Sequence, residues 1–111
     1  MPEARPNGVE TGYGYGMSHT YASNVVHCVF STKERAPFIH TDLQPRLWAY
    51  MGGVARTHGF TAIAIGGTED HSHALLLVPP RIPIAEAVKK IKAASSKWIH
   101  DQYPERKHFA W

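Results

Sequence analysis

The sequence contains one cysteine, Cys28, and no long run of apolar residues. A single cysteine cannot form an internal disulfide, which is typical of a reducing compartment, so we expect the protein in the cytoplasm. The longest apolar run, residues 74–78, is far shorter than the roughly 20 residues that a membrane-spanning helix needs, and no membrane partner is expected. With 111 residues the chain has room for one domain and is too short for a (β/α)₈ barrel, which needs roughly 250.

Acidic residues are few, and the net charge at pH 7 is +3. The excess is concentrated in residues 81–107, where seven Lys or Arg stand against three Asp or Glu. A basic segment of this kind favours an anionic partner, although so small a net charge does not identify one.

Residues 1–16 are rich in Gly and Pro without apolar periodicity, and we expect them to be a disordered leader. Residues 17–111 then predict one domain whose elements follow in the order strand, helix, strand, strand, helix. The expected strands are 20–32, 60–65 and 71–78. The expected helices are 41–59, with a capping box formed by Thr41 and Gln44, and 83–103. The fold class is therefore α+β: a ferredoxin-like antiparallel sheet with two helices on one face, lacking its final strand.

The strongest local signal is His71-Ser72-His73 on the third expected strand. Residues i and i+2 of a strand point to the same face, so both imidazoles can share a divalent ion. Glu69 and Asp70 could add an oxygen ligand or orient a ring. An equally open interpretation of this triplet is that the two histidines are ordinary surface residues that bind no ion. His27 could reach the same face or be structural.

The last expected helix carries a basic face. Its members are Lys89, Lys90, Lys92, Lys97, Ser95 and Ser96. These groups could contact phosphates, but an ordinary solvated helix face is the commoner explanation of such a pattern.

Three tracts are similar to a known family: MSHTYASNVVHCVFSTKERAPFI, GFTAIAIGGTEDHSHALLLVPP and IAEAVKKIKAASSKWIHDQYPERKHFAW. They resemble the transposases of the smallest bacterial insertion sequences, the single-tyrosine members of the HUH endonuclease superfamily. The resemblance covers residues 17–111. It implies a mobile-element enzyme that binds single-stranded DNA hairpins as a homodimer, and whose ferredoxin-like fold also includes a helix that carries the catalytic residue.

The resemblance also implies roles for particular residues. His71 and His73 would hold Mg²⁺ or Mn²⁺, which polarises the scissile phosphate while a tyrosine attacks it and forms a phosphotyrosine link. Lys89, Lys92, Ser96 and Lys97 would contact DNA.

The sequence departs from the family at two points. Ser72 stands where the family has a bulky apolar residue, which predicts a loss of stability. The family's nucleophilic tyrosine, and the glutamine that is its third metal ligand, follow on a helix beyond the tract that ends at Trp111. We therefore expect no catalytic residue in this chain and no cleavage by it alone, unless a full-length transposase subunit supplies the helix. The alternative is a non-enzymatic single-stranded DNA-binding module, or a regulator of an intact element.

Overall fold

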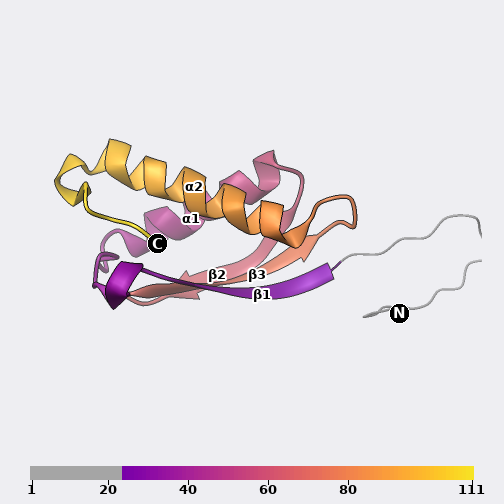
Figure 1. Cartoon of the computed structure of the whole chain (residues 1–111), viewed down its shortest axis with the longest axis horizontal. Helices are drawn as coiled ribbons and strands as arrows, with labels where there is room; N and C mark the ends of the chain where they lie inside the picture. Colours follow the sequence, from indigo (N-terminus) through magenta and orange to yellow (C-terminus); the bar gives the residue numbers. More distant parts are fainter. Residues whose placement is uncertain (1–23) are drawn as a thin grey trace, which may run out of the picture.

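Three strands form one antiparallel sheet, and two helices lie on one of its faces (Figure 1). The computed structural model describes residues 24–111, so the expected leader, 1–16, lies outside the described residues. The strands are β1 (Asn24–Ser31), β2 (Thr61–Gly67) and β3 (His71–Val78), and the helices are α1 (Gln44–Thr57) and α2 (Ile84–Gln102). Two short 3₁₀ turns are η1 (Lys33–Arg35) and η2 (Pro104–Arg106).

The sheet has the strand order β1-β3-β2, with β3 antiparallel to both neighbours. β2 and β3 form the expected hairpin, and β1 pairs with the far side of β3. This is the order of a ferredoxin-like sheet without its last strand, and residues 104–111 add no strand to it. The predicted α+β class and the two helices on one face are confirmed.

The start of the first helix differs from the prediction. The expected capping box is wrong, because α1 begins at Gln44 and the Gln44 side chain donates to the carbonyl of Ile39, 3.2 Å away. Residues 41–43 form a turn in which the backbone N–H of Leu43 reaches the carbonyl of His40. Leu43 is fully buried, so the packing of this side chain accounts for the later start.

The core lies between the helices and the inner face of the sheet. β3 alternates between buried and less buried residues along its length, as a strand with one covered face does. Its inward side chains pack against the buried residues of both helices. The largest fully buried core residues include Leu43, Leu47, Met51, Leu76, Ile91 and Ile99.

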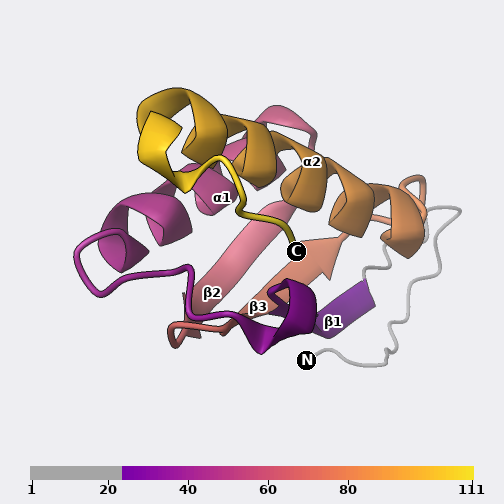
Figure 2. The ribbon, with the colours of Figure 1, turned by 60° about the vertical axis from the view of Figure 1, so that its left-hand side comes forward.

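Neither helix covers the other face of the sheet in the described part of the chain (Figures 1 and 2). Val25, Val29 and Ile63 remain 61%, 56% and 52% exposed there. Exposed apolar side chains grouped on one face are unusual for an isolated domain. Neither α1 nor α2 is long and apolar enough to cross a lipid bilayer.

Candidate metal and nucleic-acid sites

His71 and His73 lie side by side on the uncovered face of β3. Their ring centroids are 4.8 Å apart and the rings meet nearly at right angles. The intervening Ser72 points the opposite way, into the core. His71 is partly buried, and His73 is exposed. The structure therefore brings together the two imidazoles that the spacing placed on one face.

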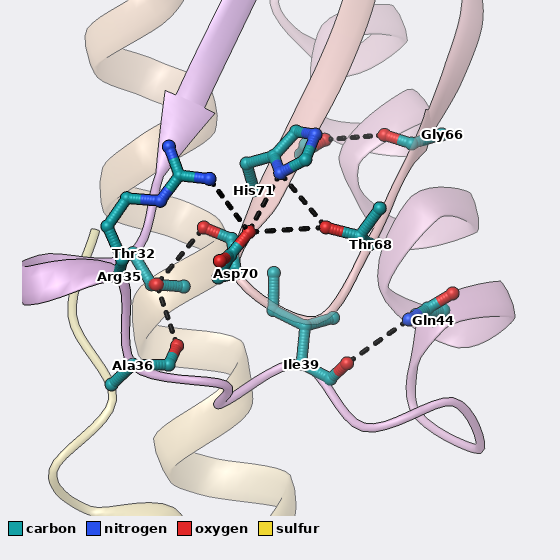
Figure 3. Close-up of polar contacts among 10 residues, drawn as sticks. Thr32, Arg35, Ala36, Ile39, Gln44, Gly66, Thr68, Asp70 and His71 are labelled. Atoms are coloured by element: carbon teal, nitrogen blue, oxygen red, sulfur yellow. Dashed lines mark hydrogen bonds and ion pairs between the residues drawn. The ribbon is translucent and has the colours of Figure 1, made fainter.

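Asp70 fixes the orientation of the His71 ring (Figure 3). Its Oδ1 lies 2.8 Å from His71 Nδ1, and it also accepts from the Thr68 hydroxyl and from Arg35, both at 3.3 Å. The hydrogen bond with His71 lowers the pKa of the Asp70 carboxyl below its usual range, and the charge of Arg35 adds to this effect. The carboxylate is consequently ionised at neutral pH and can only accept hydrogen bonds.

This network determines the tautomer of His71. Because an ionised Asp70 cannot donate, the proton between the two groups belongs to Nδ1 of the ring. In the neutral imidazole, Nε2 then carries the lone pair. Within residues 24–111 that nitrogen has no hydrogen-bond partner, so it is free to bind a ligand.

His73 has a different partner, His27 of β1. The two rings stack with centroids 5.3 Å apart, and His27 Nε2 lies 3.2 Å from His73 Nδ1. His27 faces Leu75 in the strand register and is therefore diagonal to His73. Sequence reasoning left this contact open, because the register of β1 against β3 decides it.

The residues present fit a divalent ion only in part. The two rings offer nitrogen ligands whose Nδ1 atoms are both engaged, an arrangement typical of metal-binding histidines. Over residues 24–111, however, no three His, Cys, Asp or Glu side chains converge on one point. Asp70 acts on the His71 ring, and Glu69 is held by its backbone oxygen, which accepts from Ile39 N–H at 2.9 Å. A bound ion would complete its coordination with water or with groups from outside this region.

The turn before β3 is held to the segment after β1. Thr32 donates to the carbonyl of Asp70 through its backbone N–H at 2.9 Å and through its hydroxyl at 3.1 Å. On the opposite side of the turn, Gly67 approaches β3 so closely that a Cβ there would collide with the carbonyl oxygen of His71. Only glycine fits at that position.

Ser72, which stands where the family has a bulky apolar residue, lies in the core and is fully buried. Its hydroxyl donates to the carbonyl of Gly66, 3.2 Å away. A buried hydroxyl with a partner avoids most of the desolvation cost of an unpaired one, so Ser72 is better accommodated than its polarity alone predicts.

Replacing Ser72 with alanine should lower the free energy of unfolding by about 1 kcal/mol, the net contribution of one hydrogen bond. This corresponds to a decrease of about 4–8 °C in melting temperature for a domain of this size. Urea denaturation of the wild type, Ser72→Ala and Ser31→Ala measures the effect. Ser31 is exposed at the end of β1 and should change stability by less than about 0.5 kcal/mol. Equal stability of Ser72→Ala and the wild type would show that the hydrogen bond to Gly66 contributes nothing.

The helix α2, which carries the candidate DNA-contacting residues, lies in the helix layer above the sheet (Figure 2). The histidines lie on the other, uncovered face of β3, because the Ser72 between them is buried in the core. The structure therefore does not bring the two groups together. Lys89 and Lys92 are exposed, and neither has a carboxylate partner among residues 24–111. Ser96 is half-buried. Lys97 pairs with Asp101 at 2.6 Å, and this hydrogen bond raises the pKa of its ammonium group.

The expectation that the Ser95 hydroxyl could contact phosphate is wrong. The side chain is fully buried, and it donates to the carbonyl of Ile91 at 2.6 Å. It also accepts a hydrogen bond from the indole N–H of Trp111, 2.9 Å away. Ser95 therefore attaches the C-terminal residues to α2 and presents nothing to solvent.

The tyrosines of the described region also lie in the helix layer. Tyr50 stacks on Trp98 with centroids 5.0 Å apart, and the hydroxyl of Tyr103 accepts from Arg46. Neither hydroxyl is on the sheet face that carries the histidines. Cys28 packs against the core, and burial raises the pKa of its thiol, so it remains protonated and is a poor nucleophile.

Comparisons with known proteins extend over most of the chain. A family model described as "Transposase IS200 like" matches residues 20–111. The sequence is 26% identical over 106 residues to the ISDra2 transposase TnpA of Deinococcus radiodurans, a match that spans 96% of this chain and 72% of that protein.

The fold is also similar to that of a solved structure. A crystal structure of a Deinococcus radiodurans protein assigned as a transposase superposes with a TM-score of 0.70 and 24% identity, over 86% of this chain and 70% of that one. At this identity the likeness establishes the fold alone.

Proposed function

This chain belongs to the family of IS200-like transposases, and from that premise we propose that it is an HUH-type single-stranded DNA-binding and metal-binding domain. The observation that carries the proposal is the pair of adjacent imidazoles, His71 and His73, on a sheet face that the helices leave uncovered. Each ring has its Nδ1 engaged by a neighbouring side chain. The folded unit is proposed to be the expected domain, residues 17–111.

The proposed metal ligands are Nε2 of His71 and Nε2 of His73. Mg²⁺ and Mn²⁺ are the proposed ions, and nitrogen ligands favour Mn²⁺, because Mg²⁺ strongly prefers oxygen. When bound, the ion would polarise a phosphate oxygen of the DNA. The protein's own contribution is to hold both rings in place, His71 through Asp70 and His73 through the stack on β1.

The proposed DNA contacts of α2 are Lys89, Lys92, Ser96 and Lys97. Because they lie on the layer opposite the histidines, the protein would contact DNA on two faces. A single-stranded hairpin would lie against the basic helix, while a flanking strand would pass the histidines. Lys97 is expected to contribute less than Lys89 or Lys92, since Asp101 offsets its charge.

The proposed partners, besides DNA, are a second copy of this chain or a full-length transposase subunit. The exposed apolar side chains beside the histidines, Val25, Val29 and Ile63, favour such a partner. This face also bears the candidate metal ligands, so a subunit seated there could supply further groups to the site.

Without such a partner, we propose that the chain binds DNA but does not cut it. Tyr50 and Tyr103 are the tyrosines in the described region, and both are engaged in the helix layer, away from His71 and His73. This placement supports the alternative function, a non-enzymatic binding module or regulator.

Incubation of the protein with a single-stranded DNA hairpin and Mn²⁺ should give a mobility shift under native conditions. After denaturation in detergent, it should give no covalent protein–DNA adduct, because neither tyrosine of residues 24–111, Tyr50 or Tyr103, places its hydroxyl beside the histidines. A 5′-labelled and a 3′-labelled hairpin detect an adduct on either side of the break. An adduct that persists in the wild type would contradict the proposal, and its loss in Tyr50→Phe or Tyr103→Phe would identify the nucleophile.

A further inference from the structure

His27 lies outside the His71-Ser72-His73 triplet, yet it contacts one of the two candidate ligands directly. Its ring stacks on that of His73 at an interplanar angle of 28°, and His27 Nε2 lies 3.2 Å from His73 Nδ1. His27 belongs to β1 and is 46 residues away from His73 in the sequence. The contact therefore joins an exposed side chain of β1 to the exposed ring of His73 on β3.

The hydrogen bond couples the tautomers of the two rings. Two neutral imidazoles can share one proton between His27 Nε2 and His73 Nδ1 only if one of these nitrogens donates and the other accepts. If His73 Nδ1 donates, its Nε2 carries a lone pair and can bind a metal ion. If His27 donates instead, His73 Nε2 carries the proton and cannot bind one.

The neighbouring histidine indicates which arrangement the site needs. His71 donates from Nδ1 to the ionised Asp70, so its Nε2 is available as a ligand. For His73 to act with it, His73 must have the same tautomer, and His27 is the acceptor that the structure offers to its Nδ1. The two rings would then be prepared by different neighbours, one by a carboxylate of the preceding turn and one by an imidazole of the adjacent strand.

We propose that His27 is a positioning residue for the metal site: it accepts the Nδ1 proton of His73 and so presents His73 Nε2 as a ligand. The inference rests on the proposed function in naming a metal ion, but the tautomer of His73 can be measured without one. His27 does not itself bind the ion, and it acts through the hydrogen bond and the ring stack. The carboxylate or carbonyl that usually orients such a histidine is thus replaced by a second imidazole.

Two variants separate the hydrogen bond from the stack. His27→Phe keeps an aromatic ring against His73 but removes the acceptor, whereas His27→Gln can restore an acceptor through its amide oxygen. His27 is exposed, so neither change disturbs the core. His58→Phe makes the same substitution at an exposed histidine at the end of α1, away from the proposed site, and is the matched control.

Nitrogen-15 NMR of the metal-free protein reports the tautomer, and titration calorimetry with Mn²⁺ reports the affinity. We expect His73 to be protonated at Nδ1 in the wild type and in His58→Phe, and to shift toward the Nε2-protonated form in His27→Phe. Mn²⁺ affinity should fall by about 10- to 100-fold in His27→Phe and recover largely in His27→Gln.

Three results would overturn the inference. His73 protonated at Nε2 in the wild type, or unchanged in His27→Phe, would remove the proposed hydrogen bond. Equal loss of Mn²⁺ affinity in His27→Phe and His27→Gln would make His27 a direct ligand. A failure of the proposed metal site is a separate result, recognised when a variant lacking both His71 and His73 binds Mn²⁺ as well as the wild type.

Discussion

Mn²⁺ is expected to raise the melting temperature of the wild-type protein, and the double substitution His71→Ala with His73→Ala is expected to abolish this increase. An ion that binds only the folded state stabilises it by RT ln(1 + [L]/Kd), which is about 1.4 kcal/mol at ten times Kd. For a domain of this size that corresponds to about 6–11 °C. Thermal unfolding followed by circular dichroism, with Mn²⁺ increased from zero to 10 mM, measures the shift.

The effect should be specific to this histidine pair. His40 and His108 are exposed elsewhere on the molecule, so the variant His40→Ala with His108→Ala removes two imidazoles and leaves the site intact. Its Mn²⁺-dependent shift should equal that of the wild type. Mg²⁺ should give a smaller shift than Mn²⁺ at equal concentration, because two nitrogen ligands suit it poorly. A double variant that keeps its shift would place the ion elsewhere on the molecule.

The second large effect concerns DNA binding by α2. Lys89→Ala with Lys92→Ala should weaken binding to a DNA stem–loop with a single-stranded flank by about 25- to 60-fold at 0.1 M salt. The estimate assumes that each lysine releases about 0.7 counterions from a single strand or about 0.9 from a duplex. The slope of log affinity against log salt should also become shallower by about 1.4–1.8. Fluorescence anisotropy at a series of salt concentrations gives both quantities.

A charge-matched variant distinguishes contact from general attraction. Lys33→Ala with Lys107→Ala removes the same two charges from exposed positions outside α2. It should leave the salt slope within about 0.3 of the wild-type value if those side chains touch no phosphate. Equal slopes for the two double variants would contradict the assignment of Lys89 and Lys92 as phosphate contacts.

Much of the fold could be predicted because its signals are local. The alternation in β3 and the apolar stripe of α2 are periodic patterns, and the structure follows them closely, with β3 at His71–Val78 as expected. The start of α1 was predicted less well. The Thr41 and Gln44 pair has the right spacing for a capping box, but the burial of Leu43 sets the conformation of that turn.

The features that could not be predicted depend on strand register and on packing between distant segments. A bulge in β2 at Ala62 and Ala64 leaves Ile63 exposed, and no pattern in the sequence marks it. Ser95 lies on the helix that carries the lysines, but its side chain is buried. The segment that ends at Trp111 packs back against α2, and the indole N–H of Trp111 donates to the Ser95 hydroxyl.

In the candidate site, too, some features follow from local spacing and others depend on strand register. The common face of His71 and His73 follows from their spacing alone. The contact between His27 and His73 needs the register of β1 against β3, which comes only from the folded structure. The separation of the α2 lysines from the histidines, on opposite sides of the sheet, is likewise seen only once the chain is folded.

The turn before β3 is fastened from two sides, by Thr32 at Asp70 and by Ile39 at Glu69. These bonds are made wholly within the protein, so the conformational entropy of the turn is lost when the chain folds. An incoming ligand therefore meets backbone that is already ordered, and its affinity is not reduced by the cost of arranging it. Changes at Thr32 or Ile39 that loosen this turn would move that entropic cost from folding to binding, although neither residue is a proposed ligand.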